Sequence, residues 1–156
     1  MNYWLMKSEP NTYGIDKLYA ALKKTDHWEG VRNYQARNFM RDQMKRGDKA
    51  FFYNSNCDLP SIVGTMEIVQ ESHADFTAWD LNSKYYDPKS SPENPRWFMV
   101  KVRLLEKWKH PIALHTLKQY RELQNMILLK PGNRLSVMPI TATEWDFINK
   151  LQLKPT

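Results

Sequence analysis

Alternation of apolar residues with a more polar set is clearest in the segment 97–105. Phe98, Val100, Val102 and Leu104 alternate there with Met99, Lys101 and Arg103. A period of two is typical of a β-strand with one buried face. Short apolar runs at residues 3–6, 50–53, 61–70 and 135–137 predict four further strands.

Helical spacing of apolar residues occurs in other segments. Residues 15–24 place their apolar side chains on one face, which predicts a helix. Asn33 is a good N-cap for a second helix that extends to about Met44, and we expect a third helix over residues 111–123. A capping box, Thr141-Ala142-Thr143-Glu144, predicts a final helix to about residue 151.

The order of these elements predicts a mixed α+β fold, with one domain over residues 1–156. The connections between strands are uneven in length, which argues against regular βαβ repetition. They favour a small, mostly antiparallel β-barrel with flanking helices. Residues 82–95 form a long predicted loop with three prolines, and loops of this length are often functional.

The charge is unevenly distributed along the chain. Residues 1–50 carry ten Lys/Arg and six Asp/Glu, residues 51–100 carry three and seven, and residues 101–156 carry ten and four. These segments have formal charges of +4, −4 and +6, which sum to the net charge of +6. A basic chain with an acidic middle suggests one positive face, and such a face favours nucleic acid as a partner. Aromatic residues make up 13% of the chain, including six Trp, more than core filling alone requires.

Several classes of chemistry lack their sequence signals. A single cysteine, Cys57, excludes an internal disulfide and suits a reducing compartment. Neither a P-loop nor a dinucleotide-binding glycine motif is present, so we expect no cofactor. The histidines and the lone cysteine lack metal-ligand spacing, so we expect no metal site and no zinc deaminase. We also expect no signal peptide and no membrane span, a bacterial-like cytoplasmic location, and a monomer.

Four segments combine rings with polar groups in predicted loops: residues 4–10, 28–38, 51–55 together with 85–90, and 133–139. The second feeds a predicted helix N-terminus, which attracts anions, and Gly30 would let the backbone approach another group closely. Each segment also has a purely structural interpretation, in which its rings belong to the core and its charges face solvent. We favour function for residues 28–38 and structure for residues 51–55 with 85–90.

These segments resemble the EVE domain family. The matching blocks include Trp28-Glu29-Gly30-Val31-Arg32-Asn33-Tyr34-Gln35-Ala36-Arg37-Asn38 and Arg134-Leu135-Ser136-Val137, and they follow the family order across nearly the whole chain. The resemblance implies a PUA-like fold with a pocket for modified bases of DNA or RNA. The pocket residues that it implies are Trp4, Lys7, Ser8, Trp28, Val31, Arg32, Asn33, Asn38, Tyr53, Ser55, Asp87, Arg134, Ser136 and Val137.

Two positions depart from the family pattern. Asn54 stands where family members commonly have His, and Met138 stands where they commonly have Gln. If those side chains read the base, this protein prefers a different modification. Outside the pocket, we expect Arg37, Arg41 and Lys45 to attract the nucleic-acid backbone in a salt-dependent way, together with Arg32.

The resulting hypothesis is base readout without catalysis, in an aromatic-lined pocket that accepts one modified base, such as a modified cytosine. No residue is predicted to be catalytic in this hypothesis. A competing hypothesis is a hydrolase or nuclease that acts on modified nucleic acid and uses Lys7, Glu9 or Asp87 as acid or base. A third hypothesis is an adaptor whose pocket holds a small metabolite or a peptide.

Overall fold

The computed structural model describes residues 1–153, and its centre is a six-stranded sheet in the order β2-β5-β4-β3-β1-β6. The strands are β1 (Tyr3–Ser8), β2 (Thr25–Trp28), β3 (Lys49–Asn54), β4 (Ser61–Ala74), β5 (Phe98–Ala113) and β6 (Val137–Ile140). β1 and β3 pair in parallel, and the other neighbouring pairs are antiparallel. The predicted α+β class with a mostly antiparallel sheet is therefore confirmed.

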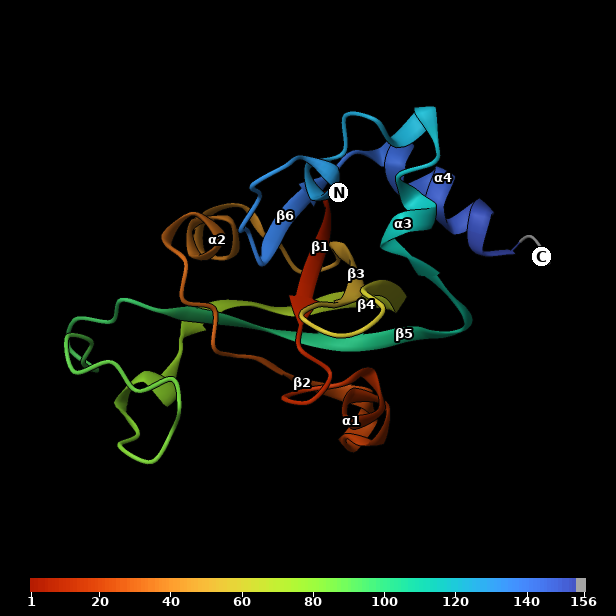
Figure 1. Cartoon of the computed structure of the whole chain (residues 1–156). Helices are drawn as coiled ribbons and strands as arrows, with labels where there is room; N and C mark the ends of the chain where they lie inside the picture. The colour runs from red at the N-terminus through yellow and green to blue at the C-terminus, as the bar shows by residue number, and fades with distance from the viewer. Residues whose placement is uncertain (154–156) are drawn as a thin grey trace.

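The sheet is strongly bent but remains open. Figure 1 shows β1 and β6 steeply inclined to the long β4–β5 hairpin. In the described residues β2 and β6 are the two edge strands, so hydrogen bonds do not close the predicted barrel. Pro139 lies in β6, where the missing N–H of a proline is tolerated because the strand has a free edge.

Each face of the sheet packs against its own hydrophobic core. Trp4 and Phe52 face a core that also contains Leu18 of α1 and Met40, while Leu5 and Phe51 face a second core. Side chains alternate across a strand, so β1 and β3 are buried on both faces. We favoured a structural interpretation of residues 51–55, and Phe52 and Tyr53 are both buried.

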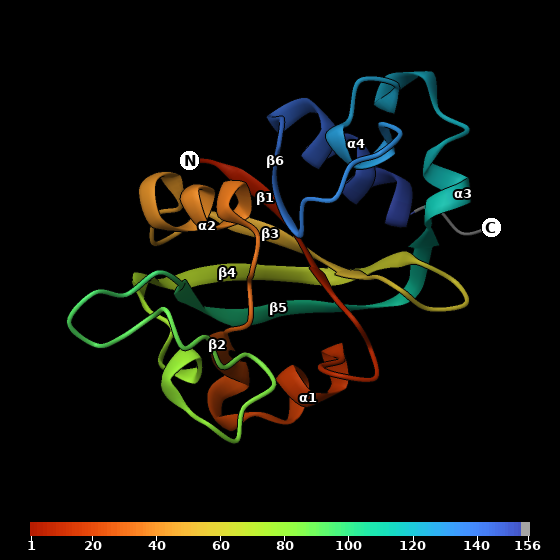
Figure 2. The ribbon, with the colours of Figure 1, turned by 60° about the vertical axis from the view of Figure 1, so that its left-hand side comes forward.

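In the described residues, the first three α-helices are shorter than the sequence pattern predicts, and the fourth extends slightly beyond its predicted end. They are α1 (Ile15–Ala20), α2 (Tyr34–Asn38), α3 (Leu114–Leu117) and α4 (Ala142–Leu153), and Figure 2 shows α3 and α4 on the opposite side of the sheet from α1. Asn33 caps α2 by accepting a hydrogen bond from Ala36 N at 2.9 Å. The predicted capping box of α4 is also confirmed, because Thr141 and Glu144 exchange hydrogen bonds of 3.0 and 3.1 Å.

One predicted helix is broken, and another changes its helix type. After α1 the chain makes a short 3₁₀ turn, η1 (Leu22–Lys24), in which Lys23 and Lys24 have positive φ, so the helix over residues 15–24 is broken. The helix predicted from Asn33 to about Met44 keeps its extent, because α2 continues as the π-helical segment η2 (Phe39–Gln43). Three further 3₁₀ turns are η3 (Phe76–Trp79), η4 (Arg121–Leu123) and η5 (Ile127–Leu129).

β4 and β5 form a long, irregular hairpin. Their register shifts at several points, and residues 75–97 connect them as a protruding loop at one end of the hairpin (Figure 2). The ends of this connection are joined by a hydrogen bond from Asp75 N to Trp97 O at 2.8 Å. The helix predicted over residues 111–123 starts only after β5, because residues 112–113 pair with residues 61–62 of β4.

Candidate functional site

A cavity of about 340 Å³ lies between the end of β1, strand β2 and the segment that precedes β6. β1 contributes Lys7 and Ser8, and residues 134–136 approach from the β6 side. β2 contributes residues 26–28, and the loop after it contributes residues 29–31. Since β2 and β6 are the two edge strands, the bent sheet brings its opposite edges to one cavity.

Aromatic rings from three separate segments line this cavity: Tyr13, Trp28 and Tyr85. The indole of Trp28 is 6% exposed and meets Phe52 edge to face at 5.2 Å, so its position is fixed by the core. Tyr13 donates a hydrogen bond to Asp26 at 2.6 Å, and burial is the main cause that raises the pKa of Tyr13. Such rings offer faces on which a flat heterocycle can stack.

The β2 side of the cavity carries acidic groups. Both carboxylate oxygens of Asp26 are occupied, by the Tyr13 hydroxyl and by the backbone N–H of His27. The described residues provide Glu29 with neither a hydrogen bond nor an ion pair. Burial, followed by the charges of Asp75 and Asp26, raises the pKa of the Glu29 carboxyl.

His27 extends the polar part of this wall. Its Nδ1 lies 3.3 Å from Nε2 of His73, and its ring meets Phe76 edge to face at 5.6 Å. Burial, followed by the charge of Lys101, lowers the pKa of His27. The neutral ring is therefore favoured at this position.

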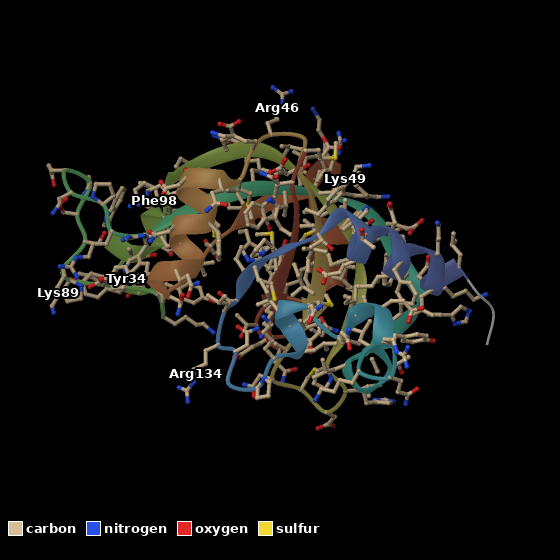
Figure 3. All side chains as sticks on the ribbon, turned by 90° about the horizontal axis from the view of Figure 1, so that it is seen from above. Tyr34, Arg46, Lys49, Lys89, Phe98 and Arg134 are labelled. Carbon is tan, nitrogen blue, oxygen red and sulfur yellow. The ribbon has the colours of Figure 1, made fainter. Side chains whose placement is uncertain are left out.

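The opposite side of the cavity carries hydrogen-bond donors. Burial lowers the pKa of the Lys7 amine, which lies 6.0 Å from the Tyr53 ring centre. Ser55 and Ser136 add hydroxyl groups to the wall. Arg134 is exposed, and Figure 3 shows its side chain extending outward from the loop before β6.

Arg32 holds the wall in place without lining the cavity. Its guanidinium pairs with the buried carboxylate of Asp75 at 3.1 Å and donates to Tyr85 O at 2.8 Å. The same group lies 5.4 Å from the Tyr85 ring and 5.3 Å from the Trp97 ring. Asp75 also accepts a hydrogen bond from Gly30 N at 2.9 Å, so one ion pair fixes both the Gly30 loop and Tyr85.

The structure brings half of the residues implied by the resemblance to this cavity. They come from β1, β2, the loops after β2 and β3, and the segment before β6. These lining residues are Lys7, Ser8, Trp28, Val31, Ser55, Arg134 and Ser136.

The other implied residues lie outside the cavity wall, for physical reasons that the structure makes plain. The Trp4 indole is buried in the core and donates to Asp48 at 3.0 Å, so no base can stack on it. Tyr53 and Val137 are core residues, and burial raises the pKa of Tyr53 to about 12. The polar residues among them form hydrogen bonds or an ion pair within the protein. These are Arg32, Asn33, Asn38 and Asp87.

The residues expected to attract phosphates lie along α2, η2 and the turn that follows. Arg41 and Lys45 are exposed, and Arg41 pairs with Asp42 at 2.8 Å. Arg37 is partly buried and donates to Arg96 O at 2.9 Å. Figure 3 shows Arg46, next to Lys45, at the edge of the molecule opposite Arg134 on the cavity rim.

Sequence reasoning did not place several wall residues in the pocket. Asp26 and His27 lie on β2, whose four residues Thr-Asp-His-Trp lack an apolar run, so the strand itself was missed. Tyr85 was given a structural interpretation, and it is the group that approaches Gly30 closely. Further wall residues outside the set implied by the resemblance are Glu9, Thr12, Tyr13, Glu29, Gly30, Lys84 and Leu135.

Residues 1–153 contain neither of two other kinds of site. In this range, no group of three His, Cys, Asp or Glu side chains is arranged to hold a metal ion. None of the helices in the same range combines the length and apolar character needed to cross a membrane.

Comparison with known proteins gives consistent matches. A family model described as the EVE domain matches residues 2–151. Human thymocyte nuclear protein 1 is 44% identical over 170 residues, which cover 98% of this chain and 75% of the human protein. A crystal structure of the human THYN1 protein in complex with DNA containing 5-methylcytosine is 43% identical and has a TM-score of 0.92, with 100% of each chain covered.

A more distant match concerns the fold alone. The YTH domain of the Zygosaccharomyces rouxii MRB1 protein, solved with N6-methyladenosine RNA, is 17% identical and has a TM-score of 0.58. The alignment covers 99% of this chain and 88% of the YTH chain. The PUA-like architecture that the sequence predicted is thus shared with a domain of low sequence identity.

Proposed function

This chain belongs to the EVE domain family, and we propose that it binds nucleic acid and accepts one modified base, such as a modified cytosine, in the cavity between β1 and β2. The observation that carries the proposal is the cavity itself. Three rings, Tyr13, Trp28 and Tyr85, converge there beside both acidic groups and hydrogen-bond donors. The complex of the human relative with DNA containing 5-methylcytosine supports the same conclusion.

The proposed mechanism is binding of an unpaired or flipped base. Stacking on the rings contributes about 1–3 kcal/mol per base, and polar groups of the wall pair with the base edge. Lys84 and Arg134 at the cavity, with Arg37, Arg41 and Lys45 further away, would attract phosphates. A base modification is selected because its added group fills space or makes a contact that the plain base lacks.

We propose binding without turnover. Of the three residues named in the hydrolase hypothesis, Lys7 and Glu9 line the cavity. Asp87 lies outside the cavity wall and accepts a hydrogen bond from Trp97 Nε1 at 2.7 Å. That bond, followed by one from Lys89 N, lowers the pKa of Asp87, so the carboxyl is a poor proton donor near neutral pH. Incubation with a labelled modified oligonucleotide should leave it intact, and cleavage or base release that disappears in Asp87→Ala would establish the enzyme instead.

The decisive measurement is fluorescence anisotropy with two single-stranded oligonucleotides that differ by one methyl group on one cytosine. A buried methyl contributes about 0.8 kcal/mol, so the methylated strand should bind about 4-fold more tightly or better. Ser136→Phe fills the cavity and should abolish this preference, whereas Thr143→Phe on the exposed side of α4 should retain it. Equal affinity for both strands in every variant would leave a generic binder, and binding of free nucleosides or peptides alone would favour the adaptor.

The proposal also includes a monomer in the cytoplasm. The curated mammalian relatives carry the word nuclear in their names, so the compartment needs its own experiment. Fluorescence microscopy of the tagged protein in its own cells and sedimentation of the purified protein would test the two points.

A further inference from the structure

Glu29 is the unpaired acid of the cavity wall. Three acidic side chains line the cavity in the described residues: Glu9, Asp26 and Glu29. Glu9 accepts a hydrogen bond from Asn56 at 3.2 Å, and both oxygens of Asp26 are occupied. Glu29 alone among these three has neither a hydrogen bond nor an ion pair within residues 1–153, and its exposed side chain lies on the cavity wall.

The surroundings of Glu29 partly disfavour its ionised form, although the side chain is exposed and water reaches it. Desolvation disfavours the charged carboxylate, and the nearby charges of Asp75 and Asp26 add repulsion, which together raise its pKa. Arg32, whose charge acts to lower the pKa of Glu29, already pairs with Asp75 at 3.1 Å. A hydrogen-bond donor on a bound ligand would offset part of this cost.

The cavity offers a free acceptor on one side and donors on the other. Glu29 follows β2, whereas Lys7 of β1 and Ser136 before β6 line another part of the wall, where the acid Glu9 is already bonded to Asn56. A base that contacts both parts of the wall must present a donor to Glu29 and an acceptor to the other side.

Cytosine and thymine differ in this respect. Cytosine carries an amino group at C4 and an acceptor oxygen at C2, so it can donate to an acid on one side and accept from a cation on the other. Thymine has the same ring and the same methyl group as 5-methylcytosine, but an acceptor oxygen at C4. That oxygen would face a carboxylate, which cannot donate to it when ionised.

Building on the proposed function, we propose that Glu29 accepts a hydrogen bond from the exocyclic amino group of the base, so that the cavity selects 5-methylcytosine over thymine. Trp28 and Tyr85 contribute stacking that is insensitive to this difference, because every base has a π-face. Selection between the two bases therefore falls to the polar wall, and Glu29 is a specificity-determining residue.

The test compares single-stranded oligonucleotides that carry 5-methylcytosine, thymine or an abasic site at one position, by anisotropy at constant salt. The wild-type protein should bind 5-methylcytosine about 10-fold more tightly than thymine. Glu29→Gln, whose amide can turn to donate or accept, should reduce this ratio to about 2-fold or less, mainly through tighter binding of thymine. Glu122→Gln on the exposed turn η4 makes the same charge change away from the cavity and should keep the wild-type ratio.

The outcomes separate the two levels of the proposal. If the wild-type protein binds all three oligonucleotides equally, the cavity does not receive a base and the proposed function itself fails. If the abasic strand binds more weakly but thymine equals 5-methylcytosine, the base enters and the role of Glu29 is overturned. A 10-fold preference that persists in Glu29→Gln also overturns that role, because another group must then read the amino group. Thermal unfolding of each variant verifies that its fold is intact.

Discussion

Gly30 shapes the cavity through the absence of a side chain. Its φ is +83°, and a Cβ at this position would lie 2.4 Å from Cζ of Tyr85. The Tyr85 ring can therefore pack onto the backbone of the β2 loop and form one wall of the cavity. Arg32 holds the ring from its other end through Tyr85 O, so both contacts determine where the wall stands.

Replacement of Gly30 should separate backbone strain from loss of the wall. Gly47 has a similar φ of +93°, and a Cβ there would meet no atom within 4 Å, so Gly47→Ala should cost only strain, about 1–2 kcal/mol. Gly30→Ala must also displace Tyr85 and should lose about 1–3 kcal/mol more, together with oligonucleotide affinity. Urea unfolding and anisotropy measure the two effects. Equal losses of stability in the two variants would contradict the packing of Tyr85 onto Gly30.

Asp48 explains why Trp4 is a core residue. Its buried carboxylate accepts three hydrogen bonds, from Trp4 Nε1 at 3.0 Å, Asn2 N at 3.1 Å and Lys45 N at 2.9 Å. Asp48→Ala leaves these donors unpaired, and we expect a loss of about 3 kcal/mol in the free energy of unfolding. Asp42→Ala, at an exposed ion pair with Arg41, should leave stability nearly unchanged in the same urea titration. A mild effect of Asp48→Ala would mean that water replaces the carboxylate.

The raised pKa of Glu29 makes stability depend on pH. Because the folded state holds this proton more tightly than the unfolded state, Glu29 favours folding at low pH and loses that contribution as the pH rises from its ordinary value of 4.5 through its folded value. Glu29→Gln lacks this loss, so it should melt at a higher temperature than wild type at about pH 7 and show no such gain at about pH 4. Glu122→Gln provides the baseline. A gain that is independent of pH would show that the ionised carboxylate is not its cause.

At the scale of elements, Gly64 allows β4 and β5 to approach each other at a register shift. A Cβ on Gly64 would lie 2.3 Å from the backbone oxygen of Glu106 and 2.6 Å from Cδ1 of Ile15. The strands shift register between Ile62 and Gly64, where the ladder brings Gly64 opposite Lys107. The contact to Glu106 is with backbone, which cannot move aside as a flexible side chain can.

Gly64→Ala should therefore destabilise the protein by about 3 kcal/mol, because the hairpin must open at this point. Gly14→Ala, where a Cβ would meet Pro10 O at an ordinary 3.4 Å, is the matched control and should be close to neutral. Denaturant unfolding measures the difference. If both variants unfold at the same denaturant concentration, the close approach of β4 and β5 is not rigid.

Local pattern predicted the elements whose residues carry a strong signal of their own. The capping box at Thr141 and the cap at Asn33 were found because their hydrogen bonds join residues three positions apart. β2 was missed, and the strand over residues 98–113 was cut short, because both are held by pairing with distant strands. A helix was predicted over residues 111–123 for the same reason, since local propensity was overridden by β4.

The residues of the candidate site also divide into those that a local motif predicts and those that depend on contacts between distant segments. Ser8 and Ser136 lie at the cavity and could be named, because the family motif that contains them is specific. The motif also suggested Trp4, yet its role in the core depends on Asp48, which no local pattern connects to it. Glu29 and Tyr85 acquire their places from the bend of the sheet and from the loop over residues 75–97, and neither arrangement can be read from spacing along the chain.

At the scale of the whole molecule, the charge asymmetry should make nucleic-acid binding depend on salt. Each phosphate that is neutralised on a single strand contributes about −0.7 to the slope of log K against log salt concentration. Arg134→Ala, at the cavity rim, should weaken binding and make the slope shallower by about 0.7 if it contacts a phosphate. Arg121→Ala, at an exposed position on η4, should leave the slope unchanged. A slope of zero for the wild type would exclude phosphate contacts altogether.

Because the loop over residues 75–97 leaves and re-enters the β4–β5 hairpin at neighbouring points, joined by the bond from Asp75 N to Trp97 O, it can be regarded as an interchangeable cassette. It delivers Lys84 and Tyr85 to the cavity without taking part in the sheet ladder that supports the remainder of the wall. Exchange of this loop between relatives could thus change which bases the cavity accepts, while the sheet that supports the cavity stays the same.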